Sequence, residues 1–233
     1  MLFEFPFAVP TDERVVRAIQ TPHGAFRLQA RFGGEPLPAL PHAVYAQPSG
    51  EARLLHWRTP ALTAEALVCR PELALPEGMR VDGCLAVLWR VRATEPVASC
   101  AFGCTWQERQ NWLNVGAENG QGLEAFTWSD GRVTVAAGTE DGESLLARAS
   151  RGRGIPLRWA DPAVLGCSEP DCIDRVHAYE DGLHLVLPDL RPGETCQVHF
   201  AVAWAPAAQN GGESAWCAVD CTPRQILDGA HAG

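Results

Sequence analysis

The stretch that decides the fold covers residues 174–205 and reads DRVHAYEDGLHLVLPDLRPGETCQVHFAVAWA. Asp181-Gly182 is the residue pair that a two-residue type I′ hairpin prefers, because both central positions need a positive φ. Residues 191–194 supply a second turn, in which Pro192 presets one dihedral angle and Gly193 relaxes the next. The stretch therefore predicts three consecutive antiparallel strands.

Alternation of side chains separates core from surface along the last two of these strands. The apolar face carries Leu183, Leu185, Leu187, Cys196, Val198, Phe200, Val202 and Trp204. The opposite face carries His184, Gln197 and His199. We expect Leu185 and Val198 to face one core, with His184 and His199 pointing away from it.

Strand patterns recur along most of the remaining chain. Residues 24–32 alternate between apolar and polar, which predicts a strand with one solvated side. Residues 81–92 are apolar on both faces, which predicts a central strand. Further strands are predicted near 42–46, 52–57, 64–70, 97–106, 110–115, 123–128 and 214–219, with hairpin turns at Asp130-Gly131 and Asp141-Gly142 and a helical turn near 223–229. The pattern predicts an all-β fold: a large, super-sandwich-like, two-sheet antiparallel β-sandwich with little helix, formed by residues 1–233 as a single domain.

Composition narrows the classes of function. A formal net charge of −9 argues against binding of nucleic acid, which needs a basic surface to displace counterions from phosphates. All 19 basic residues are arginine, which excludes a lysine Schiff base, a pyridoxal-phosphate aldimine and a P-loop lysine. The common hydrolase, zincin and dinucleotide-binding motifs are absent too, and we expect no cofactor.

The N-terminal stretch and the cysteines bear on localisation. MLFEFPFAVP has no basic n-region and is too short to span a bilayer. We therefore expect a cytoplasmic protein with no membrane contact, whose nine cysteines are mostly reduced. Neither Cys167/Cys172 nor Cys217/Cys221 has the spacing of a zinc ribbon, so no metal site is assigned. Free thiols, a disulfide and metal binding stay open as alternatives for both pairs.

Three histidines are candidate catalytic residues. The predicted register puts His184 opposite His199, with His177 nearby on the same face. Three imidazoles on adjacent strands can bind a divalent metal or transfer protons near neutral pH. The alternative is a solvated polar face, and a register slip would separate the three rings.

Trp106, Glu108, Arg109 and Trp112 are the candidate ligand-binding residues. Trp106 ends a buried alternating run, polar residues turn the chain, and Trp112 begins the return strand, which places the group at the rim of the sandwich. Flat aromatic faces flanked by a carboxylate and a guanidinium suit a sugar. Filling of the core is the alternative role for tryptophan.

The closing strands carry a family resemblance. Residues 190–194 (LRPGE), followed by residues 200–204 (FAVAW), resemble the end of β-sandwich domains that accompany bacterial glycoside hydrolases. The same run is similar to the corner of fibronectin type III domains, where a tyrosine usually stands at the position of Cys196. The resemblance covers about 20 residues and implies a sandwich fold and a carbohydrate-related role in a bacterial protein, without implying a catalytic residue.

Three function classes follow. The leading interpretation is a non-catalytic β-sandwich module with a carbohydrate-related binding role or a structural, assembly role. The alternative is a sugar-processing enzyme of the epimerase, mutarotase or lyase type, whose histidine meets a carboxylate in a concave pocket. A third is a subunit that binds a protein partner or forms a homo-oligomer through a large apolar patch.

Overall fold

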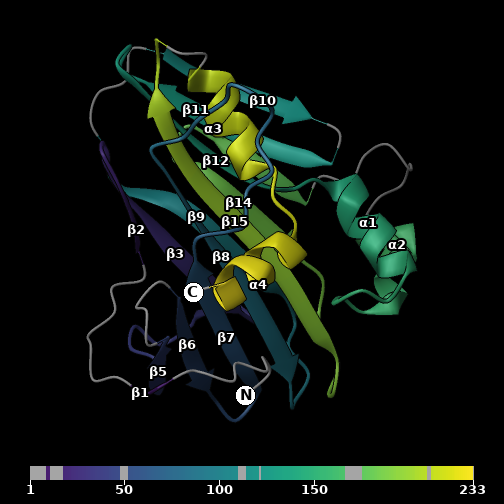
Figure 1. Cartoon of the computed structure of the whole chain (residues 1–233). Coiled ribbons are helices and arrows are strands. Elements are labelled where there is room, and N and C mark those ends of the chain that lie inside the picture. The colour runs from purple at the N-terminus through teal and green to yellow at the C-terminus, as the bar shows by residue number, and fades with distance from the viewer. Residues whose placement is uncertain are drawn as a thin grey trace.

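The computed structural model describes residues 9–10, 18–47, 52–109, 114–120, 122–165, 175–208 and 211–232. Two antiparallel sheets pack face to face, and helices cover the outside of the larger sheet (Figure 1). The predicted all-β sandwich is confirmed.

Among the described residues, nine strands form the large sheet and six form the small one. The large sheet has the order β1 (Val9–Pro10), β5 (Ala43–Ala46), β6 (Arg53–Arg58), β7 (Leu62–Cys69), β8 (Gly83–Ala93), β15 (Thr195–Pro206), β12 (Val133–Glu140), β11 (Leu123–Ser129) and β10 (Asn114–Gly120). The small sheet has the order β13 (Val176–Tyr179), β14 (Gly182–Leu187), β9 (Cys100–Arg109), β3 (Gly24–Phe32) and β2 (Ala18–Thr21), with β4 (Glu35–Pro36) paired to β3.

The main core lies between the two sheets and is built from their inward-facing apolar side chains. Leu185 of the small sheet and Val198 of the large sheet are both buried in it, which confirms the predicted assignment of faces. Aromatic rings fill much of the space; the rings of Trp57 and Trp89, for example, stack with centroids 5.7 Å apart.

Helices add a second core on the outer face of the large sheet. α3 (Gly211–Val219) and α4 (Pro223–Ala232) lie across this face, where Val219 and Ile226 are buried against β-strand residues such as Leu88 (Figure 1). At the side of the sandwich, α1 (Gly142–Ser150), η1 (Leu157–Ala160) and α2 (Pro162–Leu165) follow one another, and Leu145 and Trp159 belong to the main core.

Two local predictions at helices are wrong. The strand predicted at 214–219 is helix α3, because its buried residues follow a helical rather than an alternating order. The hairpin turn predicted at Asp141-Gly142 is the start of α1, where the Asp141 carboxylate accepts a hydrogen bond from the Ser144 amide at 2.8 Å. Aspartate favours both turns and helix N-caps, so the residue pair alone does not separate the two. The helical turn predicted near 223–229 is confirmed as part of α4.

The predicted meander of the last three strands is also wrong. β14 pairs with β9 in the small sheet, whereas β15 pairs with β8 and β12 in the large sheet. Between them the chain crosses from one sheet to the other, held by backbone hydrogen bonds between Val97 and Leu190. β15 is buried on both faces along its middle, so it needs a strand on each side and a packed layer above and below.

The β13–β14 hairpin turns one residue earlier than predicted. Tyr179 pairs with Gly182, so Glu180 and Asp181 form the turn. Gly182 lies in β14, where a Cβ atom would collide with the Cys104 carbonyl oxygen of β9 and approach the Thr105 Cα to 2.7 Å. The glycine therefore permits close pairing of two strands rather than the turn itself.

Candidate functional site: the outer face of the small sheet

The alternation in β3 creates the polar side of the small sheet. Phe26, Leu28 and Ala30 enter the core, while Arg27, Gln29 and Arg31 between them are exposed. This is the strand with one solvated side that the sequence predicts.

Four neighbouring strands contribute to this surface, which we call the small-sheet face. It is formed by the outward residues of β13, β14, β9 and β3: His177, Tyr179, Gly182, His184, Val186, Ala101, Gly103, Thr105, Arg27, Gln29 and Arg31. The strands come from residues 24–32, 100–109 and 176–187, so the face is assembled by long-range pairing.

Glycines remove side chains from the middle of the small-sheet face. Gly103 pairs with His184 on one side and with Gln29 on the other. Gly182 pairs with Tyr179 and with Thr105 in the next row. His184 and Gln29 therefore stand on either side of a position without a side chain, and Gly182 leaves a second such position between Tyr179 and Thr105. We call these two glycine positions the floor of the face.

Aromatic rings stand together on the β13–β14 side of the face. Tyr179 is 53% exposed, and its ring lies parallel to that of His177 with centroids 5.7 Å apart. The centroid of the His184 ring also lies 5.7 Å from that of Tyr179, with the two rings tilted. His184 also contacts a carboxylate, because its Nε2 lies 3.2 Å from Asp181 Oδ2.

Amide and guanidinium groups occupy the β3 side. Gln29 Nε2 donates a hydrogen bond to Thr105 Oγ1 at 2.8 Å, which leaves the Gln29 carbonyl oxygen as an acceptor toward solvent. A groove of about 550 Å³ continues from here between β3 and residues 36–39, lined by Arg27, Gln29, Arg31 and Gln107. A groove of this volume is within the range that holds a small molecule.

The structure places the predicted rim residues at one end of β9. Trp106 is half-buried and faces the core side of the sheet, with its ring centroid 3.9 Å from that of Phe26 and 5.4 Å from that of Trp128. Glu108 and Arg109 end β9, but their side chains lie outside the described part of the structure, as does the whole of Trp112. Ligand contact by this group stays a prediction.

The predicted cluster of three histidines is wrong as a single group. His177 and His184 are direct cross-strand partners on the small-sheet face. His199 lies in β15 of the large sheet and is buried on that sheet's outer side, because the chain changes sheets between β14 and β15. No three described residues among the histidines, cysteines and acids are grouped so that they could hold a metal ion.

Sequence reasoning missed Tyr179, Asp181, Gln29 and Thr105 as site residues. Alternation does mark Gln29 and Thr105 as outward, but the pairing of β3 with β9 and of β9 with β14 is not visible in the sequence. The local signal in the sequence was an aromatic residue, Tyr179, between His177 and His184 of the same predicted hairpin.

The described cysteines have free thiols: Cys69, Cys84, Cys100, Cys104, Cys196, Cys217 and Cys221. Five of them lie within strands and are buried: Cys69, Cys84, Cys100, Cys104 and Cys196. Burial raises the pKa of the Cys69 thiol to about 12, so this group stays protonated at neutral pH. Cys167 and Cys172 lie outside the described residues.

None of the helices in the described ranges has the length and apolar character needed to cross a membrane.

Comparisons of sequence and of structure with known proteins give different results. No protein-family model and no curated protein matches the chain. Among solved structures, it is similar to a protein described as a kojibiose phosphorylase from the human microbiome, with a TM-score of 0.45 and 7% sequence identity. The match covers 96% of this chain and 30% of that longer chain.

Proposed function

We propose that the protein is a carbohydrate-binding β-sandwich module that holds its ligand on the small-sheet face. The observation that carries the proposal is the exposed ring of Tyr179, which stands beside His177 and His184 at the edge of a floor without side chains. A sugar ring presents C–H groups on its faces and hydroxyl groups around its edge. An exposed aromatic ring offers a flat apolar surface for the former.

The polar groups of the face match the edge of a sugar. Asp181 accepts hydrogen bonds, while the Gln29 amide and the His184 imidazole can both donate and accept them. Gln29 and His184 project from paired strands, and Asp181 lies in the two-residue turn between β13 and β14, which keeps their positions fixed before a ligand arrives. Preorganisation of this kind reduces the entropy that is lost on binding.

The arrangement of exposed apolar residues favours this class over an interaction subunit. Within the described ranges, the large apolar side chains that are exposed are Leu40, Val115, Leu157, Tyr179 and Val186. Leu40, Val115 and Leu157 belong to separate segments, and only Tyr179 and Val186 share a face, whereas a protein interface needs a large contiguous apolar patch.

A test of the proposal uses a panel of neutral mono- and oligosaccharides and isothermal titration calorimetry. We expect Tyr179→Ala to weaken binding about tenfold or more, the scale of roughly 1.4 kcal/mol of lost contact. Leu157→Ala is the matched control, because it removes an exposed apolar side chain from η1, away from the face. Unaltered affinity in Tyr179→Ala, or no binding of any sugar by the wild type, contradicts the proposal.

One observation favours an enzyme as the second candidate function. The contact of His184 with the Asp181 carboxylate is a pairing that supports proton transfer. If the protein is a sugar epimerase or mutarotase, the wild type should convert its sugar, and His184→Ala should abolish this turnover while sugar binding persists. NMR measurement of the rate at which sugar anomers exchange, with the wild type and with the variant, decides between the enzyme and the binding module.

A further inference from the structure

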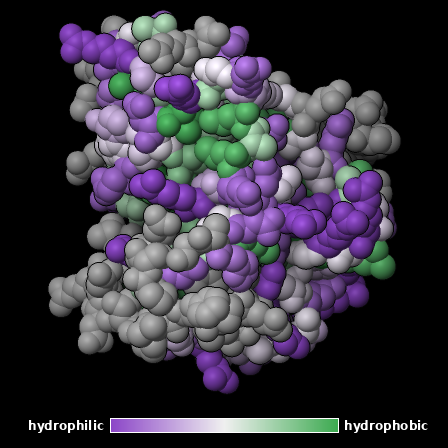
Figure 2. Space-filling view, in the orientation of Figure 1, coloured by the Kyte–Doolittle hydropathy of each residue, from purple (hydrophilic) through white to green (hydrophobic). Residues whose placement is uncertain are grey.

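A second groove lies on the opposite side of the molecule, on the outer face of the large sheet. It has a volume of about 660 Å³ and lies between β8, β15, α1 and the start of α4. Its charged lining consists of Arg90, Arg148, Arg151, Arg153, Arg224 and Glu140. We call it the arginine groove. Figure 2 shows this side of the protein, where hydrophilic side chains form a band across the middle that reaches the region of α1.

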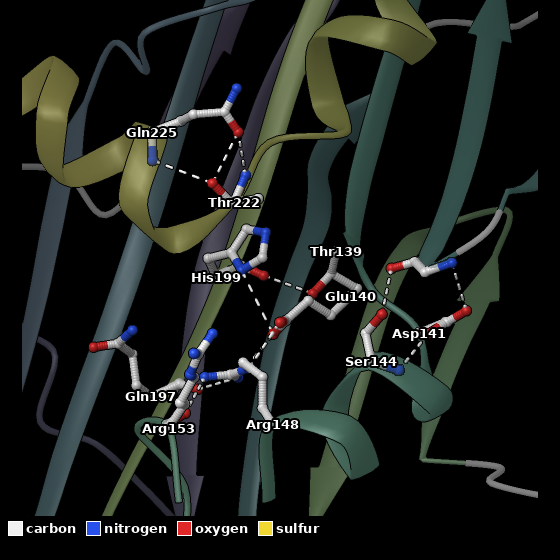
Figure 3. A network of polar contacts seen from close by, with 11 residues as sticks. Thr139, Glu140, Asp141, Ser144, Arg148, Arg153, Gln197, His199, Thr222 and Gln225 are labelled. Carbon is white, nitrogen blue, oxygen red and sulfur yellow. Dashed lines mark hydrogen bonds and ion pairs between the residues drawn. The ribbon is translucent and has the colours of Figure 1, made fainter. Parts of the chain in front are cut away.

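Arg148 and Glu140 neutralise one another at the base of the arginine groove (Figure 3). Arg148 Nε lies 2.7 Å from Glu140 Oε1, and Arg148 Nη2 donates to Glu140 Oε2 at 2.7 Å. Arg148 also donates to the main-chain carbonyls of Gln197 at 2.7 Å and of Arg153 at 3.1 Å. This arginine is therefore a structural group that ties α1 and the loop after it to β15.

The loop after α1 presents two further arginines that contact no carboxylate of the described residues. Residues 151–154 read RGRG, and both glycines have a positive φ, 59° at Gly152 and 71° at Gly154. Gly154 packs against β15, where a Cβ atom would approach Gln197 Cβ to 3.2 Å. Arg151 and Arg153 are exposed, and within the described ranges neither guanidinium contacts an acidic side chain.

Five arginines line the groove, and three carboxylates balance them. Glu140 is bound by Arg148, Asp228 lies 3.4 Å from Arg224, and the fully buried Glu65 is the cross-strand neighbour of Arg90. Two positive charges are left, in a chain whose formal net charge is −9. Those two positive charges would neutralise a phosphate monoester dianion, which carries two negative charges.

Gln197 supplies an independent pointer to a ligand. Its side chain lines the groove although the residue is only 8% exposed. Arg90 donates to Gln197 Oε1 through Nε at 3.1 Å and through Nη2 at 2.7 Å, and arginine offers donors only. These bonds fix the orientation of the Gln197 amide, with Oε1 toward Arg90 and Nε2 directed away from it. Among the described residues no group accepts a hydrogen bond from Nε2, which is left as a donor for a ligand oxygen.

We propose that the arginine groove binds a phosphorylated small molecule. The phosphate lies between Arg153 and Arg151, with the Gln197 amide as a third donor. Guanidinium groups bind phosphate oxygens through paired, charge-assisted hydrogen bonds. The volume of the groove exceeds what a lone phosphate needs, so the remaining space holds the esterified part of the ligand.

The test measures binding of inorganic phosphate and of glucose 6-phosphate by calorimetry, at an ionic strength held constant with sodium chloride. The wild type should show saturable binding to both, tighter for the ester. The double variant Arg151→Ala/Arg153→Ala should bind about tenfold more weakly or not at all. It keeps the Arg153 carbonyl that Arg148 uses, so its melting temperature without ligand should stay that of the wild type.

Two further variants complete the design. Arg70→Ala/Arg80→Ala removes the same charge from exposed positions outside the groove and should leave binding unchanged. Gln197→Glu keeps an acceptor for Arg90 but puts a carboxylate where the ligand donor was, and should abolish binding. Equal weakening in the two double variants, binding of citrate but not of the phosphates, or no saturable binding overturns the proposal. Tyr179→Ala should leave phosphate affinity unchanged, so failure of this site and failure of the sugar site are distinguishable.

Discussion

At the scale of single residues, Gly182 determines whether β14 can pair closely with β9. Its φ of 131° and its contact with the β9 backbone both exclude a side chain. The residue also lies in the floor of the small-sheet face, so the same absence of a Cβ serves strand pairing and the shape of the site.

We expect Gly182→Ala to lower the free energy of unfolding by about 2–4 kcal/mol, since it adds a backbone clash to an unfavourable φ. Gly131→Ala is the matched control: its φ is 84°, but a Cβ there meets nothing within 4 Å. That variant should lose only about 1 kcal/mol. Urea unfolding of both variants measures the difference, and equal losses would show that strand contact at Gly182 has no role.

His199 makes stability depend on pH. Burial lowers its pKa and Arg148 lowers it further, against the opposing effect of Glu140, whose Oε2 lies 3.7 Å from Nδ1. The unfolded chain takes up a proton below about pH 6.5 while the folded protein does not. Protonation of this histidine therefore favours the unfolded state. The free energy of unfolding falls as the pH drops below about 6.5.

His199→Gln should remove this part of the pH dependence. Between pH 7.5 and 5.5, the free energy of unfolding of the wild type should fall more steeply than that of the variant, as measured by urea titration at each pH. Parallel curves for the two proteins would mean that His199 does not resist protonation in the fold.

At the scale of elements, β15 is the centre of the large sheet and of the main core. Phe200 of β15 and Leu187 of β14 are fully or almost fully buried in that core from opposite sheets. We expect Phe200→Ala and Leu187→Ala each to lower the free energy of unfolding by about 2–5 kcal/mol, because each leaves a cavity between the sheets. Denaturant unfolding measures both, and a loss below about 1 kcal/mol, which is typical of surface positions, would contradict this placement.

The elements show which parts of the fold the sequence can predict. Alternation in β3 and the apolar run in β8 identify these strands, because a side chain's direction follows from local backbone geometry. The partners of each strand depend on contacts between residues far apart in the chain. For this reason the prediction that His184 and His199 point away from the main core was correct, whereas the prediction that they lie in the same sheet was wrong. The same limit hid the small-sheet face, whose strands meet only in the folded protein.

At the scale of the whole molecule, the two outer faces of the sandwich have different chemistry. Among the described residues, no helix lies on the outer face of the small sheet, which carries an exposed tyrosine, histidines and amides, whereas α3 and α4 cover much of the large sheet and leave an arginine-lined groove beside them. A neutral sugar suits the first face and a phosphate the second. The sandwich core separates them, so each proposal can fail without the other.

Mapping of a bound oligosaccharide by NMR tests the central claim most directly. In a two-dimensional amide spectrum of the protein, titrated with the tightest-binding neutral sugar of the panel, we expect the largest shifts at residues 27–31, 101–107 and 177–184. Amides of residues 148–154 and 222–224, at the arginine groove, should stay in place. Shifts confined to the arginine groove, or spread over the large sheet with none on the small-sheet face, would contradict the account.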